Sequence, residues 1–294
     1  MPLRRRAAWA AWAVLCASLT SCAQEPAREL TAAEHAELER AEHLLVRRCM
    51  AAAGFRYHPP AAPAGDDARH LSLLVLDDIA WARRNGYGGR IQQKVLAARP
   101  HDPNRLYRDS LDPARRERYD LALGGGRDTK VLSARLPGGG TINNALGGCR
   151  GTAKDRLYGD RATWFRLDKI ASNLQPLYLP ELTKDPRFVT ALTAWSACMR
   201  RGGHAYASPP EIRAALPGLT AGLKPDDAHA AEVRLAVTEA TCARSSGLPG
   251  TARALQPHYL AKAARPYAEE LAEHGRMLRA ALDRARRPPE EIAP

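Results

Sequence analysis

The sequence predicts a mainly α-helical fold: two diverged helical-hairpin units, each stapled by one disulfide, with a small β-hairpin in an insertion and a long C-terminal helix. Three observations predict this class. Apolar residues recur every three or four positions in most segments, which is the period of a helix face. The string Cys-Met-x-x-x-Gly occurs twice, starting at Cys49 and at Cys198. Four cysteines follow residue 22, and an even number in an oxidising compartment is typical of two disulfides.

The chain begins with the pattern of a bacterial lipoprotein signal. Arginines at positions 4–6 give a cationic start, and residues 7–19 form an uncharged run that is shorter than the roughly 20 residues of a membrane-spanning helix. Leu19-Thr20-Ser21-Cys22 then resembles a lipobox, in which the cysteine receives a diacylglyceryl group and becomes the first residue of the mature chain. We therefore expect residues 1–21 to be a signal peptide, residues 22–30 a lipid-anchored linker and Cys22 the lipidation site. The alternatives are an ordinary secretory signal with an incidental cysteine and an uncleaved buried helix.

The first predicted helix begins after Thr31 and ends near Gly54. Thr31 and Glu34 match a capping box, and an apolar stripe follows at Leu38, Ala41, Leu45, Cys49 and Ala52. Gly54 suits the left-handed position that ends a helix, where a Schellman motif brings Met50 against Phe55. The Cys-Met string is therefore interpreted as a helix C-terminus that carries a disulfide. A soft-metal ligand pair is disfavoured, because adjacent helical residues point in different directions.

The second copy of the string predicts an equivalent helix. It is opened by Asp185-Pro186 and ended by Gly203, and its stripe is Phe188, Leu192, Trp195 and Met199. A tyrosine and a proline pair follow the string in both copies, which indicates a duplication: Tyr57 with Pro59-Pro60, and Tyr206 with Pro209-Pro210.

The duplication also predicts how the cysteines pair, although spacing alone allows three connectivities. Cys242 lies on a helix that is opened by Asp226 and ends near Gly247, so Cys198 and Cys242 are expected to staple an antiparallel helical pair. By parity, Cys49 is expected to pair with Cys149. We assign residues 31–180 to the first unit with its insertion, residues 181–287 to the second unit with the C-terminal helix, and residues 288–294 to a tail.

A long insertion separates Cys49 from Cys149. Residues 77–85 are predicted to be helical, glycines in 86–89 and prolines in 100–103 break the chain, and residues 104–123 form two short helices split by Asp112-Pro113. Residues 131–136 and 141–146 flank Pro137-Gly138-Gly139-Gly140 and predict a β-hairpin. Helices are then expected around 153–157 and 162–170, and a final helix from about 251 to 287 that stops at two prolines.

Charge is a weak guide to the partners of this chain. The formal net charge is +12, and it falls to +9 once the three signal arginines are removed. The basic residues are 37 arginines against 7 lysines, a bias typical of a high-GC genome, so the charge does not predict a nucleic-acid partner. Outside the cytoplasm, lipid headgroups and wall polymers are the available anionic surfaces. A solvated basic face without a specific ligand is the simpler interpretation.

Several of these features occur together in one known group. The lipobox, the two Cys-Met-x-x-x-Gly strings with a following tyrosine, Asp78-Ile79-Ala80 leading to Asn85-Gly86-Tyr87-Gly88, and Gly148-Cys149 leading to Leu157-Tyr158-Gly159 resemble a group of uncharacterised actinobacterial secreted or lipid-anchored proteins. The resemblance covers most of the mature chain. It implies an envelope location and a helical, disulfide-bonded fold, and it implies no activity.

No motif in the sequence predicts a catalytic or metal site, or a cofactor. Metalloprotease, serine-hydrolase and phosphate-loop patterns are absent, and Gly124-Gly125-Gly126 is interpreted as a turn. His35 and His43 lie eight residues apart, roughly on one side of the first helix but about 12 Å apart along its axis, too far for one metal. We interpret them, with Glu34 and Glu42, as exposed polar residues of that helix.

Paired carboxylates and aromatic residues are the other candidates for function. Asp77-Asp78 and Asp226-Asp227 are interpreted as residues of helix starts, and Asp66-Asp67 as a solvated loop. Trp81, Trp164 and Trp195 could line a sugar or peptide groove, but the helical spacing of Trp195 favours the core. For Tyr57 and Tyr206, packing against the opposing helix is favoured over a surface role.

We therefore expect a non-enzymatic binding or scaffolding module, anchored by lipid to the extracytoplasmic face of the cell membrane. Its expected partners are the membrane and an anionic wall polymer or an envelope protein. The main alternative is a cell-wall-active hydrolase that uses carboxylates of the insertion, which would place poorly solvated acidic residues in one pocket. A sensor or chaperone accessory, the third alternative, would show an apolar groove between the two units.

Overall fold

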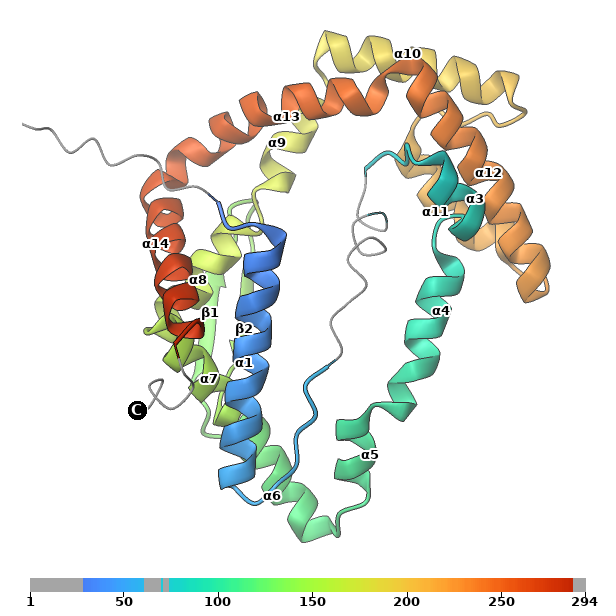
Figure 1. The fold of residues 1–294 in the computed structure, drawn as a ribbon. Coiled ribbons are helices and arrows are strands. Elements are labelled where there is room, and N and C mark those ends of the chain that lie inside the picture. Colours follow the sequence, from blue (N-terminus) through green and yellow to red (C-terminus); the bar gives the residue numbers. More distant parts are fainter. Residues whose placement is uncertain (1–28, 61–69, 71–73, 288–294) are drawn as a thin grey trace, which may run out of the picture.

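The computed structural model describes residues 29–60, 70 and 74–287, and it confirms the predicted fold class. The described chain is mainly helical, with one two-stranded antiparallel sheet and two disulfides. Figure 1 shows its helices arranged around two groups, one built on α1 and one built on α12. The lipobox and Cys22, the signal peptide, most of the linker, Asp66-Asp67 and the tail lie outside the described residues.

The first group consists of elements from both ends of the chain. They are α1 (Ala32–Ala52), α6 (Pro113–Gly124), β1 (Val131–Arg135), β2 (Thr141–Ala145), α7 (Gly148–Tyr158), α8 (Arg161–Ala171) and α14 (Ala268–Ala285). Their buried side chains form one apolar core that includes Leu45, Met50, Leu157 and Phe165. The C-terminal helix α14 thus packs on the first unit, against α1, α7 and α8.

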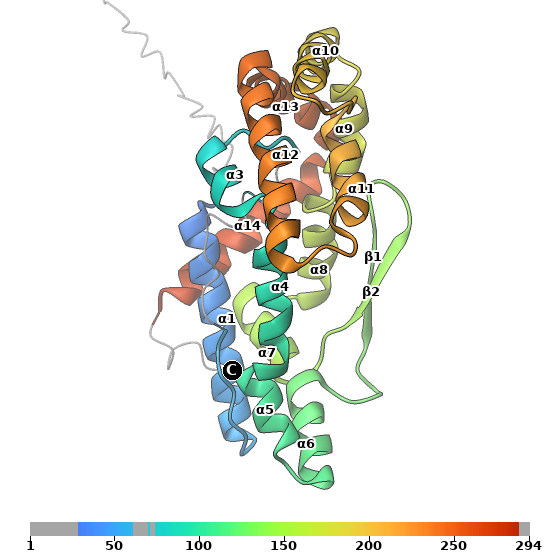
Figure 2. The ribbon, with the colours of Figure 1, turned by 90° about the vertical axis from the view of Figure 1, so that its right-hand side faces the viewer.

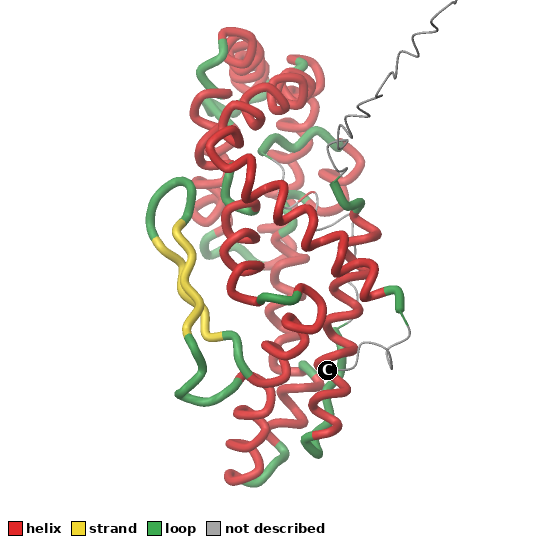
Figure 3. The backbone as a smooth tube through the Cα atoms, turned by 90° about the vertical axis from the view of Figure 1, so that its left-hand side faces the viewer, coloured by secondary structure: helices red, strands yellow, loops and turns green. Residues whose placement is uncertain are grey.

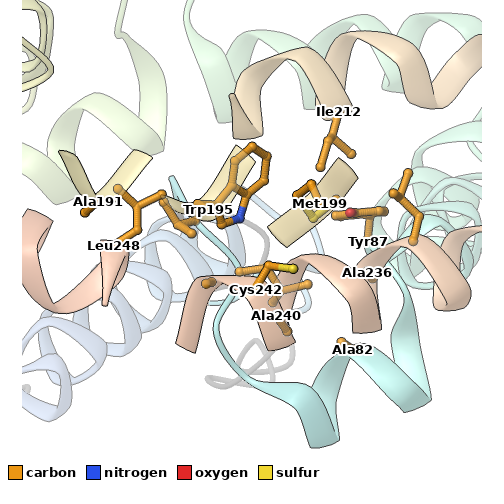
Figure 4. Close-up of a cluster of buried hydrophobic side chains, with 14 of the residues drawn as sticks. Ala82, Tyr87, Ala191, Trp195, Met199, Ile212, Ala236, Ala240, Cys242 and Leu248 are labelled. Atoms are coloured by element: carbon orange, nitrogen blue, oxygen red, sulfur yellow. The ribbon is translucent and has the colours of Figure 1, made fainter. Parts of the chain in front are cut away.

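The second group forms a separate apolar core. Its elements are α3 (Ile79–Asn85), α9 (Gln175–Leu182), α10 (Pro186–Arg201), α11 (Pro209–Thr220), α12 (Pro225–Ser246) and α13 (Leu248–Ala264). Trp195 and Met199 of α10 are fully buried there, so the preference for a core role of Trp195 is confirmed. Figure 4 shows both side chains between α10 and α12, with Ile212 and Tyr87 beside Met199. The insertion helix α3 belongs to this core, where it packs on α12.

Two long stretches of helix run between the groups in the described part of the chain, and the turn at residues 172–174 also joins them, from α8 to α9. On one side run α4 (Gly89–Ala98), the 3-10 turn Arg99–His101 and α5 (Pro103–Asp109), none of which buries a residue completely. On the other side α13 continues through the 3-10 turn Arg265–Tyr267 into α14. The predicted C-terminal helix is therefore present, with an interruption at Pro266, which has no backbone N–H to donate. Figure 2 shows α3, α4, α5 and α6 following one another down the molecule.

The two Cys-Met-x-x-x-Gly strings have the predicted helix ends. Thr31 and Glu34 form the capping box of α1. At its C-terminus Gly54 has φ +79°, and the N–H of Phe55 donates to the carbonyl of Met50 at 2.8 Å. In α10 Gly203 has φ +83°, and the N–H of His204 donates to the carbonyl of Met199 at 2.9 Å. Both are the six-to-one bond of a Schellman motif.

Both predicted disulfides are confirmed. Cys49 of α1 is bonded to Cys149 of α7, and Cys198 of α10 to Cys242 of α12. Each links two helices of one core. In the chain-entropy model, closing loops of these lengths contributes about 4 to 5 kcal/mol each to the free energy of unfolding.

The predicted β-hairpin is present, while three helices are missing from the sequence prediction. β1 pairs with β2 from Val131 opposite Ala145 to Arg135 opposite Thr141. The hairpin lies at the side of the helices (Figure 3), and its Leu132 and Ala134 are buried where β1 packs on α8. The missing helices are α4, α9 and α11. In the described part of the chain, none of the helices is both long and apolar enough to span a membrane.

Candidate functional site

A cavity of about 270 Å³ opens in the first group between α1, α8 and α14, and we call it the α1–α14 pocket. The α1 residues that line it follow one another at three- and four-residue spacing, so they share one face of the helix. Four of the five α1 side chains on this face are polar. The lining residues are His35, Leu38, Glu39, Glu42 and His43 of α1, Tyr158 of α7, Trp164 and Asp168 of α8, and His274 and Leu278 of α14.

Next to the pocket, an ammonium group of the chain contacts one carboxylate and two aromatic rings of the lining. Tyr158 and Trp164 are stacked with ring centroids 4.6 Å apart. Lys154 donates to Glu42 Oε2 at 2.8 Å and holds its Nζ 4.2 Å from the centre of the Trp164 ring. Burial, followed by the charge of Glu42, raises the pKa of Tyr158. The chain thus places one cation of its own between a carboxylate and aromatic faces, which attract cations through their quadrupole.

The α8–α14 wall holds a half-buried histidine, His274, next to a second carboxylate. Asp168 accepts from Lys169 at 2.7 Å, and its other oxygen lies 4.0 Å from Nε2 of His274. This nitrogen is buried and has no hydrogen-bond partner among the described residues. Burial lowers the pKa of His274, and the nearby Asp168 opposes that shift. Nε1 of Trp164, a buried residue, likewise has no hydrogen-bond partner in the described part of the chain.

Glu39 is the most solvent-exposed carboxylate of the three. Its side chain is 58 % exposed, and Nε2 of His43, a basic side chain of the same helix, lies 4.0 Å from it. Nδ1 of His43 is 2.9 Å from the hydroxyl of Tyr57. Burial also raises the pKa of Tyr57, which keeps this hydroxyl protonated. The pocket therefore presents Glu39 at its mouth, while Glu42 and Asp168 are each paired with a lysine.

The interpretation of the α1 polar residues as exposed is only partly right. His35 is exposed, but His43 and Glu42 are half-buried and Glu34 is buried. The reason is tertiary: α8 and α14 cover this face with residues that follow more than 100 positions later in the sequence. Tyr57 is buried, in agreement with the packing role preferred for it.

The candidate tryptophans and carboxylates are scattered over the fold. Trp81 and Trp195 are core residues of the second group, and only Trp164 lines the pocket. Asp78 caps α3 through the N–H of Trp81, and Asp77 pairs with Arg253. Other insertion carboxylates also cap helices or pair with arginine, at Asp102, Asp112, Asp109 and Asp120. Asp226 and Asp227 lie in the first turn of α12, but the N-cap itself is Lys224.

Among the described residues, the most deeply buried carboxylate belongs to a residue that was not a candidate from the sequence. Glu239 of α12 is fully buried, accepts from the N–H of Leu76 and pairs with Arg213 at 2.9 Å. Arg213 also lies over the ring of Tyr87, 4.3 Å from its centre. Glu239 could have been noticed because it interrupts the small apolar face of α12 at Leu235, Ala236, Ala240 and Ala243. Glu239 thus has a structural role: its hydrogen bonds hold α12 to α11 and to the insertion.

A second and smaller cavity, of about 180 Å³, lies between α11 and α12. Its lining is more apolar, and Tyr206 belongs to it. No group of three or more histidine, cysteine or carboxylate side chains that could hold a metal ion occurs within residues 29–60, 70 and 74–287. Of the predicted lipidation and disulfide residues, the described part of the chain contains Cys49, Cys149, Cys198 and Cys242, and all four form disulfides.

Comparison with known proteins adds no relative from which a function could be transferred. No model of a protein family matches the chain, and no significantly similar curated protein or solved structure is found.

Proposed function

We propose that this chain is a lipid-anchored binding module of the cell envelope, held by Cys22 on the extracytoplasmic face of the membrane, and that its α1–α14 pocket binds a small organic cation such as a primary amine. The observation that carries the proposal is the composition of the pocket. Three carboxylates and two aromatic side chains line it, in a protein whose net charge is otherwise strongly positive. The two disulfides are consistent with an oxidising compartment.

Lining residues of the pocket already contact a primary amine of the chain itself. Lys154 places its ammonium group against Glu42 and the ring of Trp164, so these groups are arranged to stabilise a primary amine. Glu39 offers a further carboxylate to an incoming cation. A volume of about 270 Å³ is near the lower end of the range for ligand pockets, which favours a small molecule. An anionic polymer would meet like charge here, so we place any contact with wall polymer outside the pocket.

The hydrolase alternative has less support. It required carboxylates of the insertion that converge on one site, and none of the insertion carboxylates that the structure describes lines either cavity. Six of the described ones cap α3, α5 and α6 or pair with arginines, which explains the positions of those six without catalysis. The second cavity lies within the second unit and does not form a groove between the units, so it gives the sensor alternative no support.

A titration with butylamine tests the proposed ligand class, with butanol as the uncharged control of similar size. We expect amide chemical shifts of α1, α8 and α14 to change with butylamine, with a dissociation constant in the millimolar range that suits so small a ligand. Glu39→Gln should weaken binding about three- to fivefold, the effect of one exposed charge pair. Glu37→Gln is the matched control, since Glu37 lies on the same helix and pairs with Arg286 outside the pocket.

Two results would contradict the proposed ligand class. One is binding of butanol at the pocket with the same affinity as butylamine, which would show that charge has no role. The other is an equal loss of butylamine binding in Glu37→Gln and Glu39→Gln, which would show that the cation is attracted by the general charge of α1 and not by the pocket.

A further inference from the structure

The outer edge of β2 has no partner strand in the described part of the chain. The sheet consists of β1 and β2 alone, and all five residues of β2 are exposed. β1 is held in place because Leu132 and Ala134 are buried against α8. β2 is therefore a rigidly positioned strand with one free edge, and a free edge is a template for pairing with another strand.

The register shows which backbone groups face outward. The N–H of Leu136 donates to the carbonyl of Gly140 at 3.1 Å, so these two residues form a hydrogen-bonded pair. Hydrogen-bonded and non-hydrogen-bonded pairs alternate along an antiparallel ladder. Ile142 and Asn144 accordingly face β1 with their backbone N–H and C=O groups. Thr141, Asn143 and Ala145 point theirs away from β1, toward solvent.

The edge lacks the features by which proteins usually prevent strand pairing. Such features are lysines, prolines, bulges and inward-pointing charges. The sequence of β2 is Thr-Ile-Asn-Asn-Ala, which contains no charged residue and no proline. Ile142 also leaves 38 % of its surface exposed, although its neighbour across the strands, Ala134, is buried.

We propose that β2 pairs edge to edge with β2 of a second copy of this chain, about a two-fold axis that passes through Asn143. Three residues face outward, and they are symmetric about Asn143. In an antiparallel pair centred there, Thr141 lies opposite the partner's Ala145, and Asn143 lies opposite the partner's Asn143. Every outward N–H and C=O group then finds an acceptor or donor, as an isologous contact requires.

The side chains are compatible with this arrangement. Four side chains would lie side by side across the four strands at the level of the axis: Ser133, Asn143, the partner's Asn143 and the partner's Ser133. Their polar groups can hydrogen-bond across strands. The one charged residue of the two strands, Arg135, would lie at opposite ends of the four-stranded sheet in the two copies. No like charges would therefore be brought face to face, which favours a second copy over a charged partner.

The pairing is expected to be weak in dilute solution. A single strand edge buries less surface than the roughly 1,200 Å² of a small stable interface. Confinement of both copies to one membrane raises their effective concentration and favours the pair. This part of the inference rests on the proposed lipid anchor, whereas the symmetry of the edge does not.

Cysteine cross-linking tests the pairing. The four cysteines of the two units are already in disulfides, so Asn143→Cys adds a single reactive thiol to the folded part. Across the axis the two Cα atoms would be about 5.5 Å apart, within disulfide range. Ser133→Cys is the matched control on the same face, because three strand spacings separate the two copies by about 14 Å. Under mild oxidation in membranes, most Asn143→Cys chains should migrate at twice the monomer mass, and Ser133→Cys chains should not.

A second variant and a second setting make the test independent of the anchor. Asn143→Asp on the otherwise native chain would place two like charges on the axis without adding an amine, and it should abolish the dimer seen with a non-specific amine cross-linker without unfolding the hairpin. The variants Asn143→Cys and Ser133→Cys are also compared in concentrated solution, in the absence of a membrane. Failure of Asn143→Cys to cross-link in both settings, or equal cross-linking of Ser133→Cys, would overturn the proposed pairing. Neither result depends on ligand binding in the α1–α14 pocket.

Discussion

One buried polar residue of the second core, Glu239, links α12 to α11 and to the insertion. Glu239 has no exposed surface, and its partners come from two distant segments, through Arg213 of α11 and the N–H of Leu76. Burial, reinforced by the charge of Glu239, raises the pKa of Tyr87, so this phenol stays neutral. A buried carboxylate is tolerated only when such partners satisfy it. Sequence periodicity could show that Glu239 lies on the apolar face of a helix, but it could not identify the partners.

Glu239→Ala should lower the free energy of unfolding by about 3 kcal/mol, because Arg213 and a buried N–H lose their acceptor. The expected loss of stability is smaller than for a fully buried ion pair, because the side chain of Arg213 is 35 % exposed and water can solvate it. Urea denaturation measures the change. Asp227→Ala, an exposed carboxylate in the first turn of the same helix, is the control and should cost less than about 1 kcal/mol. Equal effects of the two variants would contradict the structural role of Glu239.

His274 should make stability depend on pH on the acidic side of neutrality. Burial lowers its folded-state pKa below the ordinary 6.5, so the unfolded chain binds this proton first as the pH falls. The free energy of unfolding therefore loses a contribution from pH 6.5 downward, until the folded state is protonated too. His274→Gln should show a shallower decline than the wild type between pH 7 and pH 5.5, measured by urea titration. His101→Gln, at an exposed position, should keep the wild-type profile; identical slopes for all three proteins would refute the assignment.

At the scale of elements, local signals in the sequence were sufficient for helix ends and the β-hairpin, whereas the disulfide pairing was predicted from the duplication. The capping box at Thr31, the glycines after both Cys-Met strings and the β-hairpin are short-range features, and the structure has each of them. The helices α4, α9 and α11 were missed for a local reason as well. α9 and α11 carry proline both in their first turn and inside the helix, and α4 follows a glycine-rich turn, so each resembles a break in the chain.

The glycines of the turn Gly86-Tyr87-Gly88-Gly89 allow the backbone before α4 to lie close to α12. The carboxylate of Glu232 on α12 accepts from the N–H groups of Tyr87 and Gly89 at the start of α4. Gly86 has φ +60°, and a Cβ there would lie 2.7 Å from Cβ of Glu232. The glycines thus let the turn approach α12 closely, a contact between segments that the spacing of residues alone could not predict.

Gly86→Ala should therefore destabilise the chain by about 1–3 kcal/mol, through strain at positive φ and the clash with Glu232. Thermal and urea unfolding measure this loss. Gly250→Ala provides the contrast: it lies in helix α13 with nothing within 4 Å of an added Cβ, so the change should be neutral or stabilising by up to about 1 kcal/mol. A neutral Gly86→Ala would show that the turn does not need glycine at this position.

At the scale of the whole molecule, the two cores do not follow the order of the chain. The insertion sends α3 into the second core, and the C-terminal helix α14 completes the first core and one wall of the pocket. The spacing of His35 and His43 on one helix side could be read from the sequence. The pocket could not, because its other walls come from α8 and α14, and no local pattern brings these helices to α1. Predicting it requires the tertiary packing.

The proposed function depends on where the chain is held, and the mass of the N-terminal peptide of the mature protein tests this most directly. Mass spectrometry of the membrane fraction should find a peptide that begins at Cys22 and carries a diacylglyceryl group. Cys22→Ala should lose the modification, migrate differently and leave the membrane fraction. An unmodified Cys22 within a peptide that still contains Ser21, or a Cys22→Ala chain that stays in the membrane fraction with unchanged mobility, would contradict the claim that this protein is a lipid-anchored module.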